Sequence, residues 1–119
     1  MTIKNFSSDM SSPSLLYQGT TPTYTFTLAE DIDLSTTESV YLTFAKTNYE
    51  VLLTKEDNDL QIEGNTVSVF LEQDDTLSFP KGKVLVQVNW TYDEDGETKR
   101  ACTDIATIEV KRNLLNDTI

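Results

Sequence analysis

Hydrophobic and polar residues alternate along residues 83–92, the most regular stretch of the chain. Every second position is apolar, at Val84, Val86, Val88, Trp90 and Tyr92. Successive side chains of a β-strand point to opposite faces, so this period of two predicts a strand with one buried wall. We expect Trp90 to be the largest side chain of the core, with the other strands folded against that wall.

Shorter stretches of the same alternation occur on both sides of this strand, separated by polar connections. They cover residues 23–30, 39–46, 49–55, 60–63, 66–72 and 99–112. Residues 73–79 break the alternation and predict a single helical turn. Strands that recur about every ten residues, with turns between them, are typical of a β-sandwich. The pattern therefore predicts an all-β fold, an immunoglobulin-like β-sandwich of about seven to nine antiparallel strands.

The 119 residues fit a single domain with two short terminal segments. Residues 1–13 are rich in Ser and show no period, so we expect an N-terminal arm. Residues 14–112 make up the predicted β-sandwich domain, and residues 113–119 a C-terminal tail. The arm either frays, as chain ends usually do, or becomes ordered against a neighbouring subunit.

Isolated apolar side chains mark both terminal segments as candidate contact regions. The candidate partner-binding residues are Ile3, Phe6, Leu114, Leu115 and Ile119. We expect Ile3 and Phe6 to serve as apolar anchors in a neighbouring subunit. The three residues of the tail either dock on their own domain or do the same.

The chain is strongly acidic, with 20 acidic and 9 basic residues and a formal net charge of −11. A nucleic-acid partner is not expected, because phosphate backbones are bound by clusters of Lys and Arg. The same charge argues against binding to anionic membranes, and no apolar run approaches the length of a membrane span. Residues 1–14 lack the apolar core of a signal peptide. The acidic turns either keep the protein soluble or meet basic surfaces of a partner.

The chain offers few residues for catalysis or metal binding. It contains no histidine, which removes histidine-based triads, general bases and metal sites. Its single cysteine, Cys102, excludes an intrachain disulfide and a cysteine-rich zinc site. It indicates either assembly in a reducing cytoplasm or a fold that needs no disulfides. Asp93, Asp95 and Gly96 resemble the start of a calcium loop, but the acidic ligands that would complete it are missing. We therefore predict no catalytic residues, no metal, no cofactor and no enzymatic activity, although calcium at an acidic turn stays open.

Tyrosines in the predicted strands suggest an alternative binding function. Tyr17, Tyr24, Tyr41, Tyr49 and Tyr92 could include an aromatic platform for sugars if two or more of their rings lay exposed and coplanar on one sheet face. The chain would then be a carbohydrate-binding module for glycans of a host surface. Packing between neighbouring strands is the other explanation, since aromatic residues are common in sheets.

Several short motifs resemble small virion proteins of tailed phages. They are Tyr17-Gln18-Gly19-Thr20-Thr21-Pro22 before the alternating residues 23–28, Asp33-Leu34-Ser35, Val40-Tyr41-Leu42-Thr43-Phe44, Asn65-Thr66-Val67-Ser68-Val69, Gln73-Asp74-Asp75-Thr76-Leu77-Ser78-Phe79 before Gly82, and Val86-Gln87-Val88-Asn89-Trp90. Their order is similar to that in the N-terminal domain of BppU-type upper baseplate proteins. The resemblance covers residues 17–110. BppU-type proteins usually continue into a long further region, so this chain is expected to act as a stand-alone domain.

This resemblance implies a structural role in a virus particle. The chain would be a non-enzymatic virion protein, an immunoglobulin-like module attached to the tail or baseplate through its terminal arms. Its implied partners are other virion proteins and copies of itself, and its location is the virion, assembled in the host cytoplasm. Capsid decoration, or a place at the head or neck, is the nearest alternative.

Overall fold

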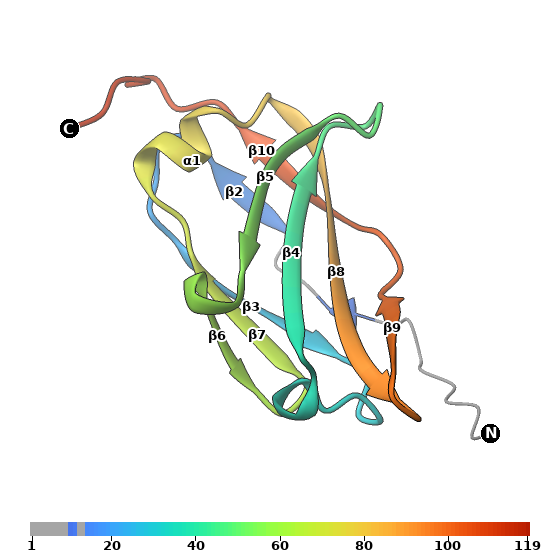
Figure 1. Ribbon diagram of the computed structural model, residues 1–119. Helices are drawn as coiled ribbons and strands as arrows, with labels where there is room; N and C mark the ends of the chain where they lie inside the picture. Colours follow the sequence, from blue (N-terminus) through green and yellow to red (C-terminus); the bar gives the residue numbers. More distant parts are fainter. Residues whose placement is uncertain (1–9, 12–13) are drawn as a thin grey trace.

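Two β-sheets pack face to face in the computed structural model, which describes residues 10–11 and 14–119 (Figure 1). The smaller sheet has four strands in the order β1-β3-β7-β6. Their bounds are β1 Met10–Ser11, β3 Thr23–Leu28, β7 Thr66–Phe70 and β6 Leu60–Glu63. Neighbouring strands of this sheet are all antiparallel. The predicted all-β sandwich is therefore confirmed.

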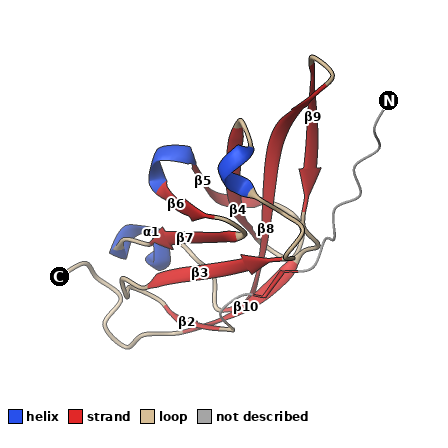
Figure 2. Ribbon diagram, turned by 90° about the horizontal axis from the view of Figure 1, so that it is seen from below, coloured by secondary structure: helices blue, strands red, loops and turns tan. Residues whose placement is uncertain are grey.

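The larger sheet has six strands and contains the strand that the alternation identified most clearly. Its path is β2-β10-β8-β4-β5, and β9 also pairs with β8. The bounds are β2 Leu15–Tyr17, β10 Ala106–Lys111, β8 Gly82–Glu94, β4 Ser39–Ala45, β5 Val51–Glu56 and β9 Glu97–Cys102. The central strand β8 exceeds the prediction at both ends, and its hairpin with β9 rises away from the body of the molecule (Figure 2).

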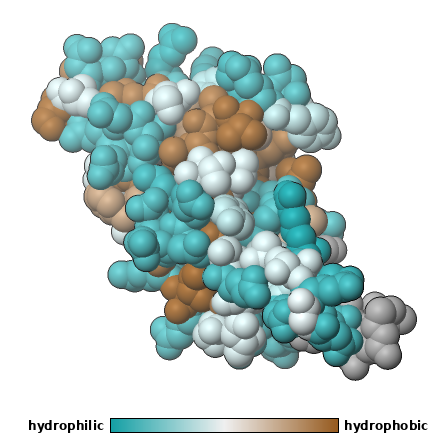
Figure 3. Space-filling view, viewed as in Figure 1, coloured by the Kyte–Doolittle hydropathy of each residue, from teal (hydrophilic) through white to brown (hydrophobic). Residues whose placement is uncertain are grey.

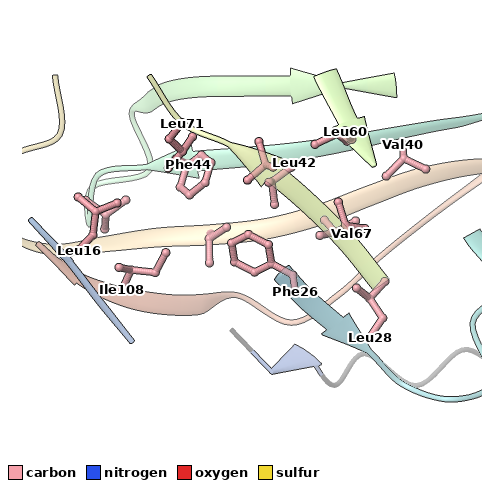
Figure 4. Close-up of a cluster of buried hydrophobic side chains, with 14 of the residues drawn as sticks. Leu16, Phe26, Leu28, Val40, Leu42, Phe44, Leu60, Val67, Leu71 and Ile108 are labelled. Atoms are coloured by element: carbon pink, nitrogen blue, oxygen red, sulfur yellow. The ribbon is translucent and has the colours of Figure 1, made fainter. Parts of the chain in front are cut away.

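The core lies between the sheets and is built from the inward-facing side of each alternating strand. Trp90 is 1% exposed and is the largest fully buried side chain, as the sequence predicted. Phe26 of β3 meets Phe44 of β4 edge to face, with ring centroids 6.4 Å apart. Figure 4 shows these rings among buried aliphatic side chains from both sheets. This continuous apolar layer holds the two sheets together.

One strand pair departs from the predicted antiparallel arrangement. β2 and β10 run parallel, with Leu16 opposite Val110. These strands come from opposite ends of the chain, so no hairpin turn determines their relative direction. With β1 and β2 included, the described residues form ten strands rather than seven to nine, because short pairings at the chain ends lack a readable alternation.

The predicted strand over residues 99–112 is interrupted, and this prediction was wrong. β9 and β10 are separate strands that follow the same side of β8, with Thr103 between them. Thr103 is 2% exposed, and its backbone N–H donates to Val88 O at 2.9 Å. Its hydroxyl accepts from Val88 N at 3.2 Å and donates to Asp104 O at 2.8 Å. A buried side-chain hydroxyl thus replaces regular strand pairing at this point.

Short helical segments connect the sheets. They are η1 Leu34–Thr36, η2 Asp57–Asp59 and α1 Gln73–Leu77. The last confirms the predicted helical turn, with Phe79 buried after it, whereas Leu77 stays half-buried. Its first turn is closed by reciprocal hydrogen bonds between Glu72 and Asp75. Asp75 also pairs with Lys55 of β5 at 3.2 Å, which ties the turn to the larger sheet.

The N-terminal arm is described only at its end. Met10–Ser11 forms β1 and extends the smaller sheet beside β3, so part of the predicted arm belongs to the sandwich. Ile3 and Phe6 lie outside the described residues. The prediction that they bind a neighbouring subunit stays a prediction.

Candidate interaction surfaces

The outer face of the larger sheet carries a shallow trough along β4 and β8. Outward-facing residues of the two strands lie opposite each other in register, with Ala45 beside Leu85, Thr43 beside Gln87 and Tyr41 beside Asn89. Two adjoining hollows share Thr43. We call them the apolar hollow and the polar hollow, and together they make the trough.

The apolar hollow lies at the end of the trough next to the β4–β5 turn and has a volume of about 200 Å³. Its exposed hydrophobic residues are Tyr49 at 71%, Val51 at 59% and Ile105 at 47%. Ala45 and Leu85 complete its lining. In Figure 3 hydrophobic residues gather over the upper part of β4, β5 and β8. Large apolar side chains gathered on a sheet face mark a candidate contact surface.

The β4–β5 turn holds Tyr49 at the rim of this hollow. Tyr49 has φ of 71°, a left-handed conformation that is uncommon for residues other than Gly. Its N–H donates to Lys46 O at 2.9 Å, and the Lys46 ammonium pairs with Glu50 at 3.0 Å. The turn therefore places an aromatic ring in solvent, beside an ion pair whose charges cancel.

The polar hollow continues the trough toward β9 and has a volume of about 250 Å³. Its lining includes Tyr41, Thr54, Asn89, Thr91 and Arg100. Arg100 Nε donates to Asn89 Oδ1 at 3.1 Å, which draws the guanidinium over the sheet face. The ion pairs formed among the described residues join lysines to carboxylates, and none of them includes Arg100. The polar hollow therefore presents a positive charge in an otherwise uncharged lining.

The C-terminal tail is fixed to the domain by its backbone, while its apolar side chains point outward. Gln73 of α1 donates from Nε2 to Ile119 O at 2.9 Å and accepts from Ile119 N at 2.8 Å. Asn113 Nδ2 donates to Gln18 O at 3.1 Å. Leu114 is nevertheless 101% exposed and Ile119 90% exposed. Leu115 is 52% exposed, so none of the three candidate residues in the tail is buried in its own domain.

The tyrosines are divided between positions against the core and positions that face outward. Tyr24 and Tyr92 are half-buried and pack against the core. The Tyr24 hydroxyl donates to Leu15 O at 2.6 Å, and burial raises its pKa above the usual 10.0. Tyr41 and Tyr49 face outward and line the two adjoining hollows. The carbohydrate-binding alternative, which needs two or more exposed and coplanar rings on one sheet face, stays a prediction.

The other chemical features singled out in the sequence gather into no larger site. Asp95 and Gly96 have φ of 54° and 81° and form the β8–β9 turn, so they serve the hairpin. Within residues 10–11 and 14–119, no group of three or more His, Cys, Asp or Glu residues is placed to hold a metal. Cys102 is a free, exposed thiol on β9. No helix in the described part of the chain is long and apolar enough to cross a membrane.

Sequence reasoning missed the trough, although one signal of it is present in the sequence. The outward positions of β4 and the paired part of β8 carry no carboxylate, in a chain with 20 acidic residues. Alternation shows that alternate residues of one strand share a face, but the trough forms only because β4 pairs with β8, a strand far along the chain. Comparison with known proteins adds no relative: no protein-family model matches the sequence, and no curated protein matches it.

Proposed function

We propose that this chain is a non-enzymatic structural protein of a tailed-phage virion, a β-sandwich module attached to the tail or baseplate. The observation that carries the proposal is the tail, whose Leu114, Leu115 and Ile119 side chains are exposed while its backbone is hydrogen-bonded to the domain. Apolar side chains held in this way suit burial in another subunit. The motif resemblance of residues 17–110 gives the partner its class, namely other virion proteins and copies of this chain.

The distribution of charge supports an assembly role. Most carboxylates lie in the turns and connections between strands, whereas the outward positions of β4 and the paired part of β8 are uncharged. Mutual repulsion would keep free subunits of charge −11 apart in solution. Contacts through the uncharged face would avoid much of that repulsion. In a symmetric particle such contacts are repeated, and repetition turns weak binding into firm attachment.

Capsid decoration, or a place at the head or neck, is the alternative position within the same class. A module of this kind can attach to any symmetric array that presents a complementary surface, so the sandwich does not favour one location. Glycan binding is the alternative function. It would use the polar hollow, where Tyr41, Asn89 and Arg100 combine a ring, an amide and a guanidinium.

The test is the protein content of purified particles. Particles of a phage that encodes this chain would be purified on a density gradient and analysed by quantitative mass spectrometry, with a phage-encoded replication protein as the negative control. We expect the chain at a fixed, multiple copy number per particle. Antibody labelling in the electron microscope would then separate tail or baseplate from capsid. Absence of the chain from purified particles, with abundance in the soluble lysate, would refute the proposal.

A further inference from the structure

The trough and the C-terminal tail have complementary properties, and they lie on different parts of the molecule. We propose that the trough of one copy binds the tail of a second copy of this chain. The inference deepens the proposed function, on which it rests for its biological setting, because it names the receiving surface for one of the implied partners. The contact needs no other protein, so it can be tested with the purified chain alone.

Both surfaces leave apolar side chains exposed to solvent. The tail exposes Leu114 and Leu115, and the apolar hollow exposes Tyr49, Val51 and Ile105. Burying aliphatic side chains in such a hollow removes apolar surface from water on both partners. A hollow of about 200 Å³ is open enough to admit side chains of this size. Each of the two apolar patches can therefore cover the other.

The tail and the trough carry side chains of opposite charge. Asp117 is exposed in the tail, two positions after Leu115. Arg100 presents its guanidinium at the polar hollow and takes part in none of the ion pairs between described residues. Because each copy carries a net charge of −11, most contacts between copies would be repulsive. An Asp117–Arg100 pair is an attractive exception, because the other residues that line the trough carry no charge.

The distance between the two hollows is similar to the distance between the leucines and Asp117 in an extended tail. Ala45 lines the apolar hollow and Tyr41 the polar hollow, and they are four positions apart on β4. At about 3.3 Å per residue, points between two and four positions apart are separated by roughly 7–13 Å. Leu114 and Leu115 precede Asp117 by three and two positions, which is roughly 7–10 Å in an extended chain. The tail can thus place a leucine in one hollow and the carboxylate in the other.

The tail that occupies the trough comes from a second copy, because each chain's own tail is held beside α1. Gln73 holds Ile119 beside α1, at one end of the molecule, whereas the trough follows β4 and β8 on the outer face of the larger sheet (Figure 1). The tail of the same chain is therefore committed elsewhere. Binding of one molecule's tail in the next molecule's trough is a heterologous contact. Such contacts generate closed rings or open filaments, according to the rotation between copies.

The experiment measures self-association of the full chain and binding of its tail. Analytical ultracentrifugation over a wide concentration range would give the oligomeric state. A fluorescein-labelled peptide of residues 112–119 with an amidated C-terminus would report binding to the full chain by anisotropy. We expect concentration-dependent association, and peptide binding that unlabelled peptide displaces. A chain that stays monomeric at all concentrations and does not bind the peptide overturns the inference.

Variants test the two hollows separately. Ile105→Asp should reduce peptide affinity at least tenfold, whereas Leu15→Asp, at an exposed position of β2 outside both hollows, should leave it unchanged. Arg100→Asp should also weaken self-association, and Asp117→Arg in the same chain should restore it. Equal effects of Ile105→Asp and Leu15→Asp, or no recovery in the charge-exchanged chain, would contradict the proposed contact. Circular dichroism confirms that each variant is folded.

These results are separable from the proposed function. A chain found in purified particles but unable to associate with itself would retain the virion role and lose this contact. A chain that associates through its tail but is absent from particles would retain the contact and lose the virion role.

Discussion

The two faces of β8 have opposite properties, although they belong to one strand. On the inner face Val84, Val86, Val88 and Trp90 are all 0–1% exposed and form the centre of the core. On the outer face Leu85, Gln87, Asn89 and Thr91 are half-buried and line the trough. The inner face is determined by the domain's need to bury apolar surface. The outer face is free of that requirement, so it can combine polar residues with partly exposed apolar ones.

The difference shows where local pattern is informative. A buried wall needs only apolar residues at period two, and this is visible within a single strand. A surface site needs particular side chains from several strands, brought together by register. Arg100 reaches the trough because β9 pairs with β8, which places Arg100 opposite Thr91. The Asp95-Gly96 turn predicts this pairing, but the meeting of Arg100 with Tyr41 in one hollow also needs β4 to pair with β8, which no local pattern indicates.

Trp90 on the inner face of β8 and Thr91 on its outer face should differ most in what they contribute to stability. Trp90→Ala should lower the free energy of unfolding by about 3–5 kcal/mol, because it leaves a cavity in a packed core. Thr91→Ala should change it by no more than about 0.5 kcal/mol. Urea denaturation followed by circular dichroism measures both, since Trp90 is the chain's single tryptophan and its fluorescence is lost in the variant. Similar costs at the two positions would contradict the assignment of faces.

Thr103 tests the point at which the alternation itself fails. Its buried hydroxyl joins Val88 N and Asp104 O, so Thr103→Val should cost about 1–3 kcal/mol by leaving a donor and an acceptor without that partner. Thr103→Ser keeps the hydroxyl and should recover part of this loss. Thr107→Val, at an exposed position of β10, is the matched control and should be nearly neutral. Thermal unfolding of the three variants provides the ranking, and a Thr103→Val protein as stable as the control would show that the hydroxyl contributes nothing.

How much was predictable follows from the same distinction. The core strands, the helical turn before Phe79 and the hairpin at Asp95 and Gly96 were all readable, because each depends on a few consecutive residues. The parallel pair of β2 with β10 was not, because it joins segments from opposite ends of the chain. The break at Thr103 escaped detection because Thr is also an ordinary strand residue. The exposure of the tail was foreseen only as one of two options.

The smallest expected effect concerns a tyrosine at the boundary between inner and outer surface. Tyr24 packs against the core, and desolvation raises its pKa above 10.0, so folding favours the neutral phenol. A raised pKa in the folded state adds stability below pH 10 that is lost as the pH rises through the folded-state value. The free energy of unfolding should therefore decline above pH 10, and Tyr24→Phe should remove Tyr24's part of that decline while losing the hydrogen bond to Leu15 O. Urea denaturation between pH 8 and pH 11 measures both slopes. Identical slopes would place the Tyr24 hydroxyl in water and contradict its burial against the core.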